Sequence, residues 1–258
     1  MLRFKSLGSG STGNATVIEA TSGTQCTRLL VDCGLGIRVL DTRLAQAGLT
    51  VGQIDAIFIT HEHSDHIGCV HKLALRHRIP VWMSHGTYQA LGCPDFEDLL
   101  RLASDCVTVD LGAMFVTPFT VPHDAREPLQ LTCSDGARRL GVLTDLGHAS
   151  AHVLAQLQGC DAMLLECNHD PDMLASGGYP AFLKRRVGGQ YGHLANHAAA
   201  DIASTLVSAG LKQVVAAHLS QQNNRPELAR AALMGAMGCE FGDVGVATAA
   251  EGSDWRTA

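Results

Sequence analysis

The segment His61–His66, with the sequence His-Glu-His-Ser-Asp-His, constrains this chain more than any other feature. It places three imidazoles and one aspartate within six residues. Neutral imidazole nitrogens and carboxylate oxygens are common ligands of divalent metals. Because 13 of the 258 residues are His, chance would place these four side chains here at a rate of about 10⁻⁵ per starting position. The segment therefore predicts a metal site, and one that can bind two ions.

The neighbouring residues predict that this segment connects a strand to a helix. Residues 54–60 are mostly apolar and indicate a buried strand, and residues 67–78 indicate a helix. Loops in such positions often carry functional residues. Four other polar side chains directly follow apolar, strand-like runs: Asp32, His123, Asp145 and His218. Because strand ends can converge at one edge of a sheet, we expect these side chains to lie together.

The motifs follow one another along the chain as Asp32, the His61/His63/Asp65/His66 group, His123, Asp145 and His218. In type and order they resemble the motifs of the metallo-β-lactamase superfamily. Residues 6–14, 166–170, 192–196 and 218–224 also resemble the small YycJ/WalJ-type branch, and the similarity extends from Leu2 to about Ala250. The resemblance implies a four-layer αββα sandwich of the α/β (α+β) class. We expect it to form one domain over residues 1–258. The branch is associated with nuclease activity on DNA.

The expected cofactors are two divalent metal ions per chain. We assign His61, His63 and His123 to one ion. Asp65, His66 and His218 are assigned to the other, with Asp145 as the bridge between them. Such a nitrogen and oxygen ligand set suits Zn²⁺, Mn²⁺ or Fe and does not choose among them.

Three side chains, Asp65, His193 and Asp32, are expected to act in catalysis. Asp32 is expected to orient the ligand loop from behind. His193 lies in a glycine-rich loop, where it can donate a proton to a leaving oxygen or contact an oxyanion. The alternative for His193 is a packing role at the start of a helix.

The expected substrate contacts are Lys184, Arg185, Arg186 and Asn14. A net charge of −6 argues against a broad nucleic-acid-binding surface but leaves room for a local basic run at residues 184–186. The alternative for this run is a solvated helix end. Asn14 lies in a glycine-rich turn that can contact phosphate, although the hairpin must turn there in any case.

Composition indicates a cytoplasmic protein without a membrane span. No window reaches 18 apolar residues, and residues 1–6 lack the apolar stretch of a secretory signal. The nine Cys are scattered and form no Cys-x-x-Cys pair, which is typical of reduced thiols. Among the expected helices are Phe96–Leu102 and Asn196–Ala209, the second with Asn196 as its N-cap.

The favoured function is a two-metal phosphodiesterase acting on nucleic acid, with a DNA exonuclease first. One alternative is a phosphodiesterase for a small or cyclic substrate. Another is a thioesterase or lactonase, because the same seven ligands also serve carboxyl-ester chemistry. The basic run and His193 favour phosphodiesters over acyl esters, and only the family resemblance favours DNA. Polarity of digestion, native metal and oligomeric state stay open.

Overall fold

The computed structural model describes residues 1–240 and 242–258, and their strands form two sheets. The first sheet has the order β14-β1-β2-β3-β4-β5-β6 and the second has the order β13-β12-β11-β10-β9-β8-β7. The strands of the first sheet are β1 (Leu2–Gly8), β2 (Ala15–Ser22), β3 (Gln25–Val31), β4 (Ala56–Phe58), β5 (Val81–Ser84), β6 (Leu100–Ala103) and β14 (Arg256–Thr257). Those of the second are β7 (Val109–Asp110), β8 (Phe115–Thr120), β9 (Leu129–Ser134), β10 (Arg139–Leu143), β11 (Ala162–Glu166), β12 (Gln213–Ala217) and β13 (Gly245–Val246).

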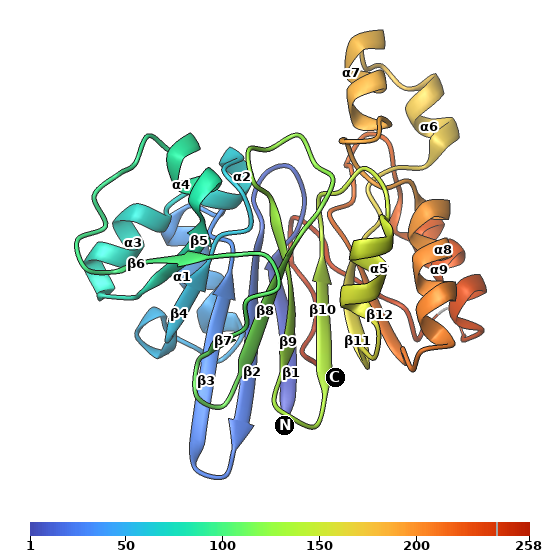
Figure 1. Cartoon of the computed structure of the whole chain (residues 1–258). Coiled ribbons are helices and arrows are strands. Elements are labelled where there is room, and N and C mark those ends of the chain that lie inside the picture. Colours follow the sequence, from blue (N-terminus) through green and yellow to red (C-terminus); the bar gives the residue numbers. More distant parts are fainter. Residues whose placement is uncertain (241) are drawn as a thin grey trace.

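Helices cover the outer faces of both sheets (Figure 1). The helices on the side of the first sheet are α1 (Ile37–Gln46), α2 (Ser64–Ile67), α3 (Val70–His77) and α4 (His85–Ala90), and a short 3-10 helix spans Val51–Gln53. Those on the side of the second sheet are α5 (Ala151–Leu157), α6 (Pro171–Ser176), α7 (Ala181–Val187), α8 (Asn196–Val207) and α9 (Pro226–Met237). This arrangement confirms the predicted αββα sandwich.

Apolar side chains hold the four layers together. Phe4, Phe58 and Leu131 belong to the cluster between the two sheets. Neighbouring residues on one strand serve two layers, because side chains alternate between the faces of a sheet. Ile18 thus packs between the sheets, whereas Val17 packs under the helices of the first sheet. Among the described residues, no helix combines the length and apolar character needed to cross a bilayer.

Strand direction places the predicted site at one edge of the sandwich. β3 pairs with β4 in parallel, and β10, β11 and β12 are also parallel neighbours. Their carboxyl ends therefore point the same way, and side chains that follow them gather at one edge, as in other open α/β sheets. Helices α6 and α7 project above the rest of the sandwich at this edge (Figure 1).

One helix starts later than expected, and two local expectations were wrong. The helix expected over residues 67–78 forms as α3, but it begins at Val70, because Ile67 ends α2 and Gly68, whose φ is +28°, follows it. Residues 100–102 of the expected helix Phe96–Leu102 instead belong to β6, an edge strand paired in parallel with β5. Helix α8 begins at Asn196 with Ala195 as its N-cap, because the Asn196 amide is engaged by Asn224. Tertiary pairing overrode local sequence preference in these last two cases.

Gly34 fixes the distance between the Asp32 turn and the metal-binding turn. A Cβ on Gly34 would lie 1.7 Å from the carbonyl oxygen of Asp65, and one on Gly68 would lie 2.4 Å from that of Cys33. Backbone hydrogen bonds hold the same contact, since Cys33 N donates to His66 O at 2.7 Å. The two turns are therefore packed backbone against backbone.

We predict that Gly34→Ala will destabilise the protein by about 1–3 kcal/mol or more, because backbone atoms must move to admit a methyl group. It will also weaken metal binding, because Asp65 is displaced. Gly36→Ala is the matched control, since Gly36 has open space around its Cβ position and an ordinary φ of −63°. Chemical unfolding and metal titration of both variants test this. Equal stability of the two variants would contradict it.

Candidate metal centre

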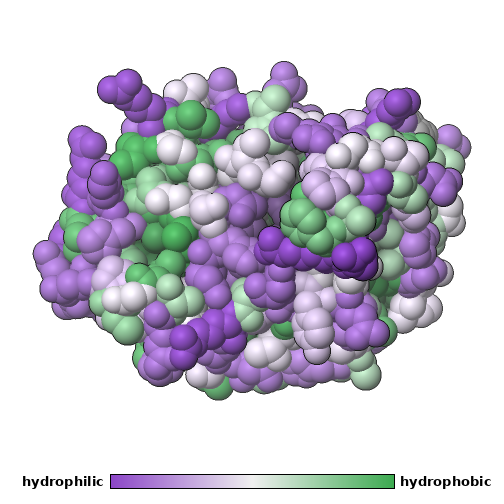
Figure 2. Space-filling view, turned by 90° about the horizontal axis from the view of Figure 1, so that it is seen from above, coloured by the Kyte–Doolittle hydropathy of each residue, from purple (hydrophilic) through white to green (hydrophobic). Residues whose placement is uncertain are grey.

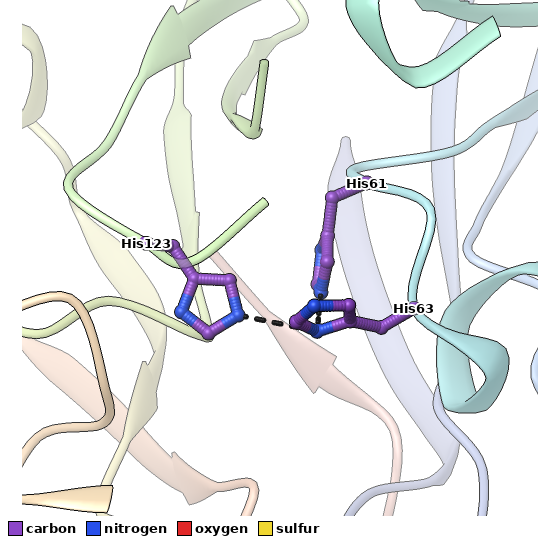
Figure 3. Close-up of side chains that lie close together, drawn as sticks. All are labelled: His61, His63 and His123. Atoms are coloured by element: carbon purple, nitrogen blue, oxygen red, sulfur yellow. Dashed lines mark hydrogen bonds between the residues drawn. The ribbon is translucent and has the colours of Figure 1, made fainter. Parts of the chain in front are cut away.

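Three imidazoles from two sheets face one another at the carboxyl edge (Figure 3). His61 and His63 follow β4, and His123 follows β8. Nδ1 of His63 lies 3.0 Å from Nε2 of His61 and 3.4 Å from Nε2 of His123. Burial and neighbouring imidazoles, chiefly His66, lower the pKa of His61, and burial lowers that of His123. Neutral imidazoles in this arrangement suit a metal ion.

A second cluster lies beside the first. Nε2 of His66 and Nε2 of His218 each lie 3.5 Å from Oδ2 of Asp65. Asp145 lies on the other side of His66, with its Oδ2 3.2 Å from His66 Nε2, and forms a potential ligand group with His61 and His66. The structure therefore brings together all seven predicted ligands in the grouping expected from the sequence. Their role as ligands stays a prediction.

Asp32 orients the imidazoles from below. It is buried, and its Oδ2 accepts a hydrogen bond from Nδ1 of His66 at 2.7 Å. The Thr60 hydroxyl donates to Asp32 and lies 3.0 Å from Nδ1 of His61. Both rings are thereby held by Nδ1, so that Nε2 points into the cluster. A carboxylate behind a histidine is the usual support for a metal ligand.

Glu166 orients two further imidazoles in the same way, those of His193 and His218. Its functional role was not predicted from the sequence. It is fully buried at the end of β11. Its Oε1 accepts hydrogen bonds from Nδ1 of His193 at 2.7 Å and Nδ1 of His218 at 3.0 Å. Its Oε2 accepts from the backbone N–H groups of Leu146 and Leu194. In the sequence, Glu166 follows the apolar run 162–165, and a charged residue in that position could have indicated a functional role.

The charges at this edge favour cations. Burial opposes ionisation, yet the imidazoles of His218 and His66 hold the pKa of Asp65 well below its usual range. Likewise, burial opposes a charged His218, but Asp145, Asp65 and Glu166 raise its pKa to about 10. Oδ2 of Asp145 and Nε2 of His218 are buried, and neither makes a hydrogen bond of good geometry, although they lie 3.2 Å from His66 Nε2 and 3.5 Å from Asp65 Oδ2 respectively. Two buried ligand atoms without a good hydrogen bond fit a divalent metal ion.

An open cleft of about 370 Å³ gives access to these side chains. Seen from above, hydrophilic residues gather around the middle of this face between two hydrophobic patches (Figure 2). His193 lines the cleft and is partly exposed. Burial alone would lower its pKa, but the nearby charges of Glu166 and Asp145 raise it above the ordinary value. His193 is thus a candidate proton donor beside the metal cluster.

The predicted substrate contacts lie in different places. Arg186 lines the cleft and pairs with Asp124 at 2.6 Å. Lys184 and Arg185 line a neighbouring pocket instead. Asn14 is buried, and its amide Nδ2 lies 3.1 Å from Oδ2 of Asp65. The structure gives Asn14 a contact that positions Asp65, while the contacts of these four residues with a substrate stay predictions.

We predict that Glu166→Gln will cost about 1–3 kcal/mol of stability. Both oxygens of Glu166 accept hydrogen bonds, so in either orientation the NH₂ group of the glutamine would face an N–H donor. The substitution will also lower metal affinity by releasing His218. Glu251→Gln, at an exposed position, removes the same charge and should change stability by less than about 0.5 kcal/mol. Thermal unfolding and metal titration distinguish the two. A Glu166→Gln variant as stable as Glu251→Gln would refute this role.

Comparisons with known proteins agree with this geometry. A family model described as a beta-lactamase superfamily domain matches residues 27–219. The chain is 36% identical over 234 residues to exodeoxyribonuclease YycJ of Bacillus anthracis, covering 89% of this chain and 86% of that protein. It is 32% identical over 232 residues to exodeoxyribonuclease WalJ of Streptococcus pneumoniae serotype 2, covering 88% and 85%. The metallo-β-lactamase fold protein YhfI from Bacillus subtilis has 17% identity, a TM-score of 0.76 and 99% coverage of both chains, which shows a shared fold.

Proposed function

This chain belongs to the metallo-β-lactamase superfamily, and from that membership we propose that it is a two-metal exonuclease that hydrolyses phosphodiester bonds of DNA. The observation that carries the proposal is the convergence of seven side chains that could bind metal beside an open cleft lined by His193 and Arg186. The relatives named as exodeoxyribonucleases support DNA as the substrate. Arg186 and His193 give the cleft two groups that can bind phosphate oxygens, which suits a phosphodiester better than an uncharged acyl ester.

In this proposal, His61, His63 and His123 would hold one ion, Asp65, His66 and His218 would hold the other, and Asp145 would be a ligand shared by the two groups. The donor set suits Zn²⁺, Mn²⁺ or Fe. When bound, two such ions would supply a nucleophilic water at neutral pH and would neutralise the charge that develops on the phosphoryl oxygens. Asp32 and Glu166 keep the ligand imidazoles in the required orientation through their Nδ1 atoms.

His193 supplies the proton that the departing alkoxide needs. Its Nδ1–H donates to Glu166 at 2.7 Å, so Nε2 is the nitrogen that can donate a proton to the substrate. The nearby carboxylates favour the protonated ring. Arg186 lines the same cleft and places a guanidinium beside the expected position of the phosphate. Its ion pair with Asp124 holds the side chain toward that position.

We predict that metal-replete protein contains close to two equivalents of metal and releases nucleotides from the ends of labelled linear DNA. Asp145→Ala will lose metal and abolish turnover, because both proposed ions lose a ligand. Elemental analysis and a DNA assay with Mn²⁺ or Zn²⁺ test this. A fully active protein with a single equivalent would refute the two-metal mechanism. Hydrolysis of thioesters or cyclic phosphodiesters without any DNA cleavage would refute the substrate.

We predict that His193→Ala lowers turnover on DNA by about 10²–10⁴-fold, which is typical for loss of a general acid. The loss should be much smaller on a nitrophenyl phosphodiester, because nitrophenolate leaves without a proton. Metal content should stay unchanged, since His193 is not a proposed ligand. Steady-state rates on both substrates, with metal analysis, test this. An equal loss on both substrates would contradict the acid role, and a loss of metal would make His193 a ligand.

A further inference from the structure

A second pocket adjoins the metal cleft and shares His193 with it. It has a volume of about 480 Å³ and lies between helices α6 and α7 and the first turn of α8. Besides His193, its lining includes Lys184, Arg185, His169 and His197. No acidic side chain belongs to its lining among the described residues. The pocket therefore gathers basic and imidazole groups in a chain whose net charge is −6.

The first turn of α8 borders this pocket. The helix has 12 residues, and its N-cap is Ala195, which has no side chain able to accept a hydrogen bond from the first turn. Asn196 does not take this role, because its amide is paired with Asn224. His197 and Ala198 lie in this first turn and line the pocket. An uncapped helix N-terminus attracts anions through its free N–H groups and the helix dipole.

His169 forms part of the inner wall of this pocket. The residue is 4% exposed, and its Nδ1 is buried without a hydrogen-bond partner, so this nitrogen is inaccessible from the pocket. The ring lies against the pocket, with Nε2 3.9 Å from the Cβ position of Gly188, which also lines it.

The two cationic side chains retain donors for a ligand. Nζ of Lys184 donates to the carbonyl oxygen of Ala175 at 2.5 Å, which leaves its other two N–H groups available. Arg185 is exposed and makes no side-chain hydrogen bond or ion pair with any described residue. An Arg guanidinium is well suited to bind two oxygens of a phosphate.

We propose that this pocket is a second phosphate-binding site, which holds a phosphate group of the DNA strand adjacent to the one at the metal centre. The inference rests on the proposed function for its ligand. Because His193 borders both pockets, a strand that occupies the metal cleft can place a neighbouring phosphate in the second pocket. The ligand is either a terminal phosphate or the next phosphodiester of the chain.

The test measures binding of metal-loaded protein to three phosphorothioate oligonucleotides that resist cleavage. One carries a 5′-phosphate, one a 3′-phosphate and one neither. We expect Arg185→Ala to weaken binding by about 10-fold or more, as for loss of a hydrogen bond between charged groups. If the pocket holds a terminal phosphate, the loss is confined to one phosphorylated oligonucleotide. If it holds an internal phosphodiester, the loss is the same for all three.

Arg76→Ala is the matched control, because Arg76 is an exposed arginine on α3, on the other side of the sandwich, and its side chain makes no hydrogen bond or ion pair with any described residue. It should leave all three affinities within about two-fold of the wild type. If Arg185→Ala behaves like Arg76→Ala on all three oligonucleotides, the phosphate site is refuted. This outcome is distinct from failure of the proposed function, which would appear as intact wild-type protein that does not cleave ordinary DNA.

Discussion

Buried negative charge at one edge of the sandwich organises the whole site. Asp32, Asp145 and Glu166 are almost inaccessible to solvent, and Asp65 is half-buried beside them. An unpaired carboxylate in such a place is costly, so each must have hydrogen-bond donors or cations around it. The imidazoles meet part of this requirement through Nδ1, and their remaining nitrogens face the oxygens of Asp65 and Asp145. Divalent ions bound here would complete the charge balance of these buried carboxylates.

A strained backbone conformation at the strand ends directs Asp32, Asp145 and His218 toward the site. Asp32, Asp145 and His218 have φ values of 61°, 57° and 53°, a left-handed conformation that costs residues other than glycine about 1–3 kcal/mol. Hydrogen bonds hold two of the turns in place: Asp32 N donates to Phe58 O, and His218 N donates to the Ser9 hydroxyl. Each strand therefore turns sharply at its end and directs its side chain inward rather than along the strand.

Local patterns in the sequence predicted many of the strands and the positions of the candidate ligands, whereas the four layers followed from the family resemblance. Apolar runs marked the strands, and His or Asp at their ends marked the edge. Glu166 was missed as a functional residue because it reads as the last residue of a buried strand, and only the fold shows that two imidazoles lie against it. Helices α6 and α7 were missed because each is short and lies outside the core. For the same reason, the basic run could not be divided between two pockets, since that depends on how α7 is oriented.

The predicted ligands are contributed by both sheets, and this affects when the site can form. His61, His63, Asp65 and His66 follow a strand of the first sheet, whereas His123, Asp145 and His218 follow strands of the second. Neither half of the chain contains a complete set for two ions. During synthesis, the last of these side chains appears only after 218 of the 258 residues have been made. The complete set of predicted ligands therefore exists only in the nearly finished chain, and an ion that bound ligands from both sheets would link the two halves.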